Sequence, residues 1–250
     1  MDTEHISRLL MPFLEQQLSE SQLKHISTYI DLLLRWNARI NLTAIRKEEE
    51  MVTRHFGESL FMARHLFPQY KYKKDCHPEW SQAKSEATGL AESKDPPAHS
   101  ETSLPHGVLS PHSSPPAVID IGSGAGFPGL PLKLWAPQIR LTLIESNYKK
   151  AAFLKEVVRA LTLTDVDVIT DRTENLADLP KAGTVTLRAV ERFETILPQA
   201  VSLVAPAGRL ALLIGAAKES VLATKTNLRW PPPIPVPLST NRILAVSHAA

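Results

Sequence analysis

The residues best suited to chemistry lie in a glycine-rich stretch, residues 117–129, with the sequence AVIDIGSGAGFPG. An apolar run ends there in Asp120 and leads into four glycines within eight residues. Glycine lets the backbone turn sharply and lets a ligand touch the main chain, and the free N–H groups at a helix N-terminus attract anionic groups. The pattern therefore predicts a buried strand, a ligand-binding turn and the start of a helix.

Two nucleotide-like cofactors fit this turn. Gly122, Gly124 and Gly126 form G-x-G-x-G, whereas Gly124, Gly126 and Gly129 also satisfy the dinucleotide pattern G-x-G-x-x-G. Glu145 ends a second apolar run, where a carboxylate can accept hydrogen bonds from the ribose hydroxyl groups of either cofactor. The glycine spacing and this acid leave both cofactors open.

Two neighbouring features favour S-adenosyl-L-methionine (AdoMet) over a dinucleotide. Pro128, which follows Phe127, is expected to disturb the start of the long helix that a dinucleotide site uses. AdoMet has no pyrophosphate and needs an acid near its amino group, which Asp120 can supply at the end of the first strand.

The composition is that of an ordinary globular protein of 250 residues with a net charge of +2. So small a charge means that any surface for RNA must be local. The single cysteine, Cys76, excludes an intramolecular disulfide, and no C-x-x-C or H-E-x-x-H spacing indicates a metal site. There is no apolar segment of membrane-spanning length and no signal-like N-terminus. We therefore expect a cytoplasmic protein without metal or membrane contact, and a monomer.

Three zones follow one another along the chain. Residues 1–70 form a helical N-terminal region that is expected to pack on the catalytic domain. Residues 71–116 are rich in Pro, Ser, His and Lys and have few grouped apolar residues, which predicts a disordered insert. Residues 117–250 form the cofactor-binding domain.

Within the first zone, Ser19 and Gln22 form a capping box that opens an amphipathic helix. A second helix is expected to start near Lys47. Residues 36–43 lie between the two and are predicted to form a polar, aromatic turn.

The third zone alternates strand-like and helix-like segments. The predicted strands are 118–121, 141–144, 166–169, 185–187, 210–214 and 243–246, with an amphipathic helix at 149–161 and a Pro-rich extended edge or linker at 231–237. This alternation predicts an α/β fold with a mainly parallel sheet, helices on both faces and ligands at the carboxyl ends of the strands.

Six motifs occur in a characteristic order. They are W-N-x-x-I-N-L-T at 36–43, R-H-F at 54–56, D-I-G-S-G-A-G-F-P-G-L-P-L at 120–132, E-S-x-x-K-K-x-x-F-L at 145–154, R-x-E at 172–174 and R-A-V at 188–190. Together they resemble the bacterial glucose-inhibited division protein B family of 16S ribosomal RNA guanine-N7 methyltransferases. The resemblance implies a class I AdoMet-dependent methyltransferase, with a Rossmann-like seven-stranded sheet behind a small helical region. The implied target is a guanine in the 530 loop of 16S rRNA, at position 527, in free rRNA or in the small ribosomal subunit.

The glycine turn and the resemblance together give a set of expected cofactor-binding residues. They are Asp120, Gly122, Gly124, Gly126, Phe127, Glu145, Thr173, Glu174 and Arg188. The resemblance implies that Thr173 and Glu174 approach the adenine and that Arg188 lies beside both cofactor and substrate. Guanine N7 has a lone pair in the ring plane and can attack a methyl group in line without a general base, so positioning supplies most of the catalysis.

Arg188, at the end of the fourth strand, is the candidate catalytic residue. Its planar guanidinium can hydrogen-bond guanine O6 or a flanking phosphate. The alternative is a surface arginine paired with an acid such as Glu191.

A second set of residues is expected to contact RNA: Asn41, Arg54, His55, Lys149, Lys150 and Arg242. For Asn41, Arg54 and His55 the alternative is that they tie the helical region to the sheet by hydrogen bonds. Lys149 and Lys150 open a helix, where the dipole disfavours cations, and this placement favours phosphate binding.

The chain also departs from the family pattern. It carries the insert, it has Glu58 where aspartate is usual, and Ile214 replaces a lysine before Gly215. The missing lysine leaves other targets open: another RNA, a protein, a small molecule, or a non-catalytic role in binding RNA during ribosome assembly.

Overall fold

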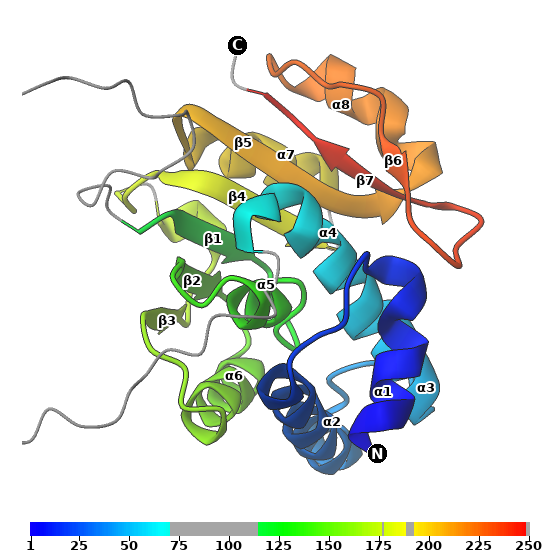
Figure 1. The fold of residues 1–250 in the computed structure, drawn as a ribbon. Helices are drawn as coiled ribbons and strands as arrows, with labels where there is room; N and C mark the ends of the chain where they lie inside the picture. Colours follow the sequence, from blue (N-terminus) through cyan, green and yellow to red (C-terminus); the bar gives the residue numbers. More distant parts are fainter. Residues whose placement is uncertain (71–114, 177, 189–192, 249–250) are drawn as a thin grey trace, which may run out of the picture. The chain divides into compact units, whose positions relative to one another are not determined.

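The computed structural model describes residues 1–70, 115–176, 178–188 and 193–248. The predicted disordered insert falls outside the described residues except for its last two positions, and so do Cys76 and Glu191. Within the described residues, seven strands form one sheet in the order β3-β2-β1-β4-β5-β7-β6 (Figure 1). The strands are β1 (Ala117–Ile121), β2 (Arg140–Ile144), β3 (Val166–Ile169), β4 (Ala182–Arg188), β5 (Val204–Gly215), β6 (Ile234–Pro235) and β7 (Arg242–Val246).

The sheet is parallel from β3 through β5, and β7 and β6 are antiparallel. This confirms the predicted α/β fold with a mainly parallel sheet. Each of the six predicted strands lies within the bounds of an observed strand. The strand order reverses between β1 and β4, which is the place where open α/β sheets bind their ligands. Ile121 at the end of β1 is in register with Ile144 of β2 and Leu187 of β4, so the carboxyl ends are level.

The side chains of the strands alternate between two buried cores because successive residues of a strand point to opposite faces. Leu210, Leu212 and Ile214 of β5 pack in one core with Phe193 and Leu197. The helices on that face are α7 (Phe193–Ser202) and α8 (Glu219–Lys225).

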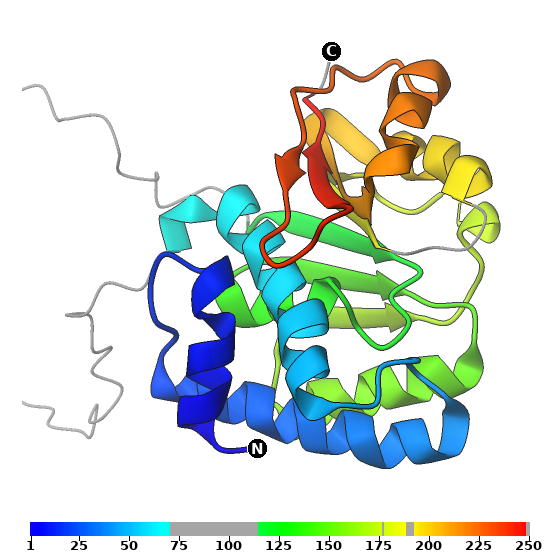
Figure 2. The ribbon, with the colours of Figure 1, turned by 90° about the vertical axis from the view of Figure 1, so that its right-hand side faces the viewer.

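The second core joins the other face of the sheet to the N-terminal helices. Ala211 and Leu213 of β5 belong to it, together with Tyr29 and Phe56 from the N-terminal region. On this face α6 (Tyr148–Ala160) lies alongside α2 (Glu20–Ile40), and α5 (Gly129–Trp135) packs against α4 (Glu58–Leu66) (Figures 1 and 2).

The N-terminal region is helical, as expected, but its boundaries differ from the prediction. The capping box is present: Gln22 N donates to Ser19 Oγ at 3.2 Å, and Ser19 N donates to Gln22 Oε1 at 2.9 Å. α2 continues through Trp36 to Ile40, so the prediction of a turn is wrong for residues 36–40. Trp36 Nε1 donates to Glu156 of α6, and this tertiary contact stabilises the last helical turn. The preceding helix α1 (Thr3–Leu10) has no counterpart in the prediction.

The helix predicted from Lys47 is present but irregular. It begins as α3 (Glu48–Glu50), continues as the π-helix η2 (Met51–Gly57) and resumes as α4. A π-helix widens the turn and is frequent at functional sites. It places Arg54 and His55 at the carboxyl end of β4, where their contacts are described below.

Candidate cofactor and RNA site

The glycine turn has an open part and a packed part. Gly122, Gly124 and Gly126 have φ of 66°, 57° and 88°, which favours glycine at each position. Gly122 is exposed, and a Cβ on Gly124 would meet only Gly122 O, at 3.8 Å. A Cβ on Gly126 would overlap the Tyr29 hydroxyl and lie 2.6 Å from Leu130. The open space that a ligand can use therefore lies beside Gly122 and Gly124, and Gly126 is required by packing.

Asp120 is fully buried beneath this turn. Its Oδ2 accepts from Gly129 N at 3.2 Å and its Oδ1 accepts from Thr186 Oγ1 at 2.8 Å. Burial raises the pKa of Asp120 to about 6, and the hydrogen bonds from Thr186 and Gly129 oppose that rise. The carboxylate thus fixes the start of α5 to β4, and any effect on a cofactor passes through the turn that it holds.

Glu145 follows β2 and holds the turn from the neighbouring strand. Its Oε2 accepts from Gly124 N and its Oε1 accepts from Asn147 N, both at 2.8 Å. Each carboxylate oxygen keeps a second acceptor position. These acceptor positions therefore suit a ribose whose hydroxyl groups donate to an acid beside a glycine turn.

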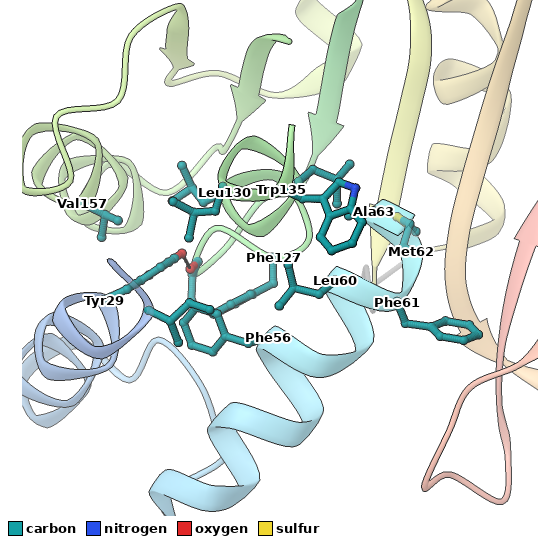
Figure 3. Packing of buried hydrophobic residues seen from close by; sticks show 14 of the residues in the cluster. Tyr29, Phe56, Leu60, Phe61, Met62, Ala63, Phe127, Leu130, Trp135 and Val157 are labelled. Carbon is teal, nitrogen blue, oxygen red and sulfur yellow. Dashed lines mark hydrogen bonds between the residues drawn. The ribbon is translucent and has the colours of Figure 1, made fainter. Parts of the chain in front are cut away.

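Phe127 ties the turn to the N-terminal helices. Its ring stacks on Tyr29 at 5.4 Å between ring centroids, and Phe56 meets its edge at 5.1 Å (Figure 3). The ring of His55 also stacks on Phe127, at 4.7 Å between centroids. Tyr29 Oη donates to Ala125 O at 2.5 Å. This aromatic cluster is buried, so Phe127 supports the glycine turn from the protein interior.

Arg188, the last residue of β4, is buried in a network of ion pairs and hydrogen bonds. Its Nη2 donates to Glu58 Oε2 at 3.1 Å and to Arg54 O at 2.5 Å, and its Nη1 donates to His55 Nδ1 at 3.1 Å. Arg242 Nη2 lies 3.0 Å from the same Glu58 oxygen. The alternative of a surface arginine is wrong: the Arg188 side chain is 6% exposed and its acid partner is Glu58.

Burial of these charges makes the network important for stability. Burial lowers the pKa of Arg188 to about 10 and Glu58 opposes this change, so the arginine stays charged at neutral pH. Removing one partner of a buried ion pair typically costs about 3–5 kcal/mol, because a charge is left uncompensated.

His55 extends the network toward the motif at 36–43. Its Nε2 lies 2.8 Å from Thr43 Oγ1, and Thr43 N donates to Asn37 Oδ1 at 2.9 Å. Burial, together with the charges of Arg188, Arg54 and Arg242, lowers the pKa of His55 to about 2. The imidazole is therefore neutral. Since arginine only donates, Nδ1 is the acceptor and Nε2 carries the proton.

The structure thus brings four predicted residues together, namely Arg54, His55, Arg188 and Arg242. The hydrogen bonds of Arg54 O and His55 also support the alternative that this segment ties the helical region to the sheet. Asn41 lies elsewhere: it ends α2 with φ 50°, and its Oδ1 accepts from Arg46 at 2.7 Å.

The remaining predicted residues surround the carboxyl edge of the sheet. Thr173 and Glu174 lie in the 3-10 turn η4 (Thr173–Asn175) that follows β3. Lys149 and Lys150 lie in the first turn of α6, after β2, and their N–H groups donate to the Asn147 cap. Among the described residues, no hydrogen bond or ion pair joins these four to the Arg188 network.

Glu58 carries more of the site than its sequence context indicates. It is a buried acid shared by two arginines. In the sequence it stands out only because its side chain is one methylene longer than the aspartate that is usual at this position. Thr43 and Asn37 belong to the first motif, but nothing in the sequence marks them as part of the hydrogen-bond chain of His55. A buried acid cannot be paired with an arginine 130 residues away without the fold.

Comparison with known proteins shows the family of this chain. A family model described as rRNA small subunit methyltransferase G matches residues 22–73 and 103–229. The chain belongs to this family. The resemblance carried by the six motifs is therefore confirmed.

Individual members of the methyltransferase G family agree with the family model. The ribosomal RNA small subunit methyltransferase G of Chloroflexus aggregans is 36% identical over 197 residues, covering 77% of this chain and 64% of that protein. The one from Desulfitobacterium hafniense is 30% identical over 230 residues, covering 90% of this chain and 77% of that protein. The chain thus spans just under two thirds of the Chloroflexus relative. A solved AdoMet-dependent methyltransferase from Aquifex aeolicus aligns with 54% of this chain and 82% of its own at a TM-score of 0.46 and 16% identity.

The methyltransferase G family identifies AdoMet as the cofactor, and the dinucleotide alternative is set aside. The open space at Gly124 and the free acceptor positions of Glu145 fit that molecule. No group of three or more His, Cys, Asp or Glu in the described part of the chain could hold a metal ion. None of the described helices is long and apolar enough to cross a membrane.

Proposed function

We propose that this chain methylates N7 of a guanine in small-subunit ribosomal RNA, in the 530 loop at position 527. One observation carries the proposal. Where the strand order reverses between β1 and β4, the open glycine turn after β1 lies between Glu145, which follows β2, and the buried Arg188 at the end of β4. The family to which the chain belongs, and the names of its relatives, support rRNA as the substrate.

The residues of the site suit a reaction that needs positioning and no base. Bound AdoMet supplies a sulfonium methyl group, and guanine N7 is an unprotonated nucleophile. His55, the histidine of this network, holds its proton on Nε2 toward Thr43 and accepts from Arg188 at Nδ1, so it does not act as a base. Arg188 Nε is buried and has no hydrogen-bond partner among the described residues.

We assign the remaining contacts by strand. Gly122 and Gly124 face the methionine part, Glu145 the ribose, and Thr173 and Glu174 the adenine, since β1, β2 and β3 are neighbours in that order. Asp120, Gly126 and Phe127 hold this surface in shape. Arg188 positions the base or the reacting methyl group.

The test is transfer of a labelled methyl group from AdoMet to 16S rRNA, offered free and as small subunits that lack the modification. We expect label in 7-methylguanosine at the 530 loop, identified by mass spectrometry of the digested RNA. AdoMet binding without transfer to either form would support the assembly-factor alternative, and label elsewhere would support another target.

Arg188→Lys tests the residue itself. Lysine keeps the charge for Glu58 but lacks the planar fork, so we expect transfer to fall by about a hundredfold while AdoMet affinity stays within about tenfold. Lys181→Arg, an exposed position at the other end of β4, serves as the control. Wild-type turnover in Arg188→Lys would contradict the assignment.

We further propose that the protein acts as a monomer in the cytoplasm. Size-exclusion chromatography with light scattering would test the first part, and cell fractionation the second.

A further inference from the structure

A pocket lies beside the Arg188 network. It has a volume of about 380 Å³ and lies between η2 and the turn that joins β6 to β7. Its polar lining includes Thr53, Arg54, Glu58, Thr240, Asn241 and Arg242. Arg242 pairs with Gly215 at the carboxyl end of β5, so the pocket opens at the same edge of the sheet as the glycine turn.

The pocket carries an excess of positive charge. Glu58 supplies one carboxylate, and a single oxygen of it faces both Arg188 and Arg242. The Arg54 side chain is exposed, and in the part of the chain that the structure describes no acid pairs with it. His55 is neutral because its pKa is about 2. Two arginines, Arg54 and Arg242, therefore line the pocket with one carboxylate, and Arg188 shares that carboxylate.

A hydrogen-bond donor at this pocket also lacks an acceptor. Arg242 lines the pocket, and its Nε is buried without a partner among the described residues. A buried N–H without an acceptor costs free energy, so an incoming group with several acceptor oxygens gains from this arrangement. Guanidinium groups match phosphate in both charge and shape.

We propose that this pocket binds a backbone phosphate of the RNA strand that carries the target guanine. The inference rests on the proposed function for the identity of the RNA, but its charge and donors stand independently. A phosphate held by Arg54 and Arg242 lies close to Glu58, the carboxylate that Arg242 shares with Arg188. The pocket thus fixes the strand beside the reacting base without reading its sequence.

The test measures binding of the full-length chain to unmodified 16S rRNA across a series of salt concentrations. Arg54→Gln removes one phosphate contact, so we expect affinity to fall about threefold to tenfold and the slope of log K against log salt to shrink by about 0.7–1. Arg140→Gln is the matched control, because Arg140 is exposed at the amino end of β2, the opposite edge of the sheet. AdoMet affinity serves as the folding check for both.

The outcomes separate the pocket from the reaction. If Arg54→Gln and Arg140→Gln keep the wild-type slope while the wild type methylates rRNA, the pocket is overturned and the proposed function stands. If the wild type methylates no rRNA, binding of a fluorescent decauridylate is measured instead. An Arg54-dependent salt slope on that probe would support the phosphate pocket without the proposed target, and a slope that is equal in both variants would overturn it.

Discussion

His55 is held neutral by its surroundings, and this has a consequence for stability. Its Nδ1 accepts from Arg188 while three arginine charges and burial lower its pKa to about 2. In the unfolded chain the same imidazole has an ordinary pKa of about 6.5. Between these two values the unfolded state binds a proton that the folded state does not, so the free energy of unfolding falls as the pH falls through 6.5.

We predict that His55→Gln removes this pH dependence. Between pH 7.5 and pH 5.5 the wild type should lose about 1.4 kcal/mol relative to the variant, which follows from protonation of one unfolded imidazole. Urea unfolding at the two pH values measures the difference. Asp120 acts in the opposite direction, because its folded pKa of about 6 lies above its ordinary 3.8 and acidification favours the folded form. Asp120 is present in both proteins and cancels in the comparison. Parallel pH profiles for wild type and variant would show that His55 is protonated in the fold.

At the scale of elements, different glycines of the turn between β1 and α5 are needed for packing and for ligand binding. We predict that Gly126→Ala prevents normal folding, since its Cβ would overlap Tyr29 and lie 2.6 Å from Leu130. Gly124→Ala should fold with a cost of about 1–2 kcal/mol for its left-handed backbone. It should nevertheless weaken AdoMet binding, because its methyl group fills the open space. Thermal unfolding and calorimetric titration with AdoMet measure the two effects. Equal loss of stability in both variants would mean that the turn has no open side.

The regular elements followed from local patterns, whereas the site required tertiary contacts. The strands could be predicted because their apolar runs are bounded by Gly, Pro and acids, and the Ser19 capping box is a local signal. The π-helix η2 and the extension of α2 through Trp36 could not, since each depends on partners far along the chain, such as Glu156. The sequence placed Arg188 at a strand end but left its partner undetermined, because the pairing with Glu58 arises only when α4 packs beside β4.

At the scale of the whole molecule, the N-terminal helices and the sheet share one buried core. Tyr29 and Phe56 belong to the same apolar cluster as Leu141 and Leu213 of the strands. The described residues fall in one compact unit, Met1–Tyr72 with Pro115–Ala250. We therefore expect a single cooperative unfolding transition for the helical region and the sheet, although they are separate zones of the sequence.

The insert lies between two points of this unit that are close in space. Gln69 and Pro116 line the same pocket, together with Arg209 and Phe67. We predict that replacing residues 71–114 by a linker of about six Gly and Ser residues preserves the transition and AdoMet binding. If the insert is a disordered loop, shortening it should stabilise the fold by about 1–2 kcal/mol, because closure of a shorter loop costs less entropy. Removal of residues 1–18 is the contrasting control, since it takes Ile6, Leu10 and Phe13 out of the core. Loss of the cooperative transition in the insert deletion, at the level of that control, would show that the insert is part of the folded structure.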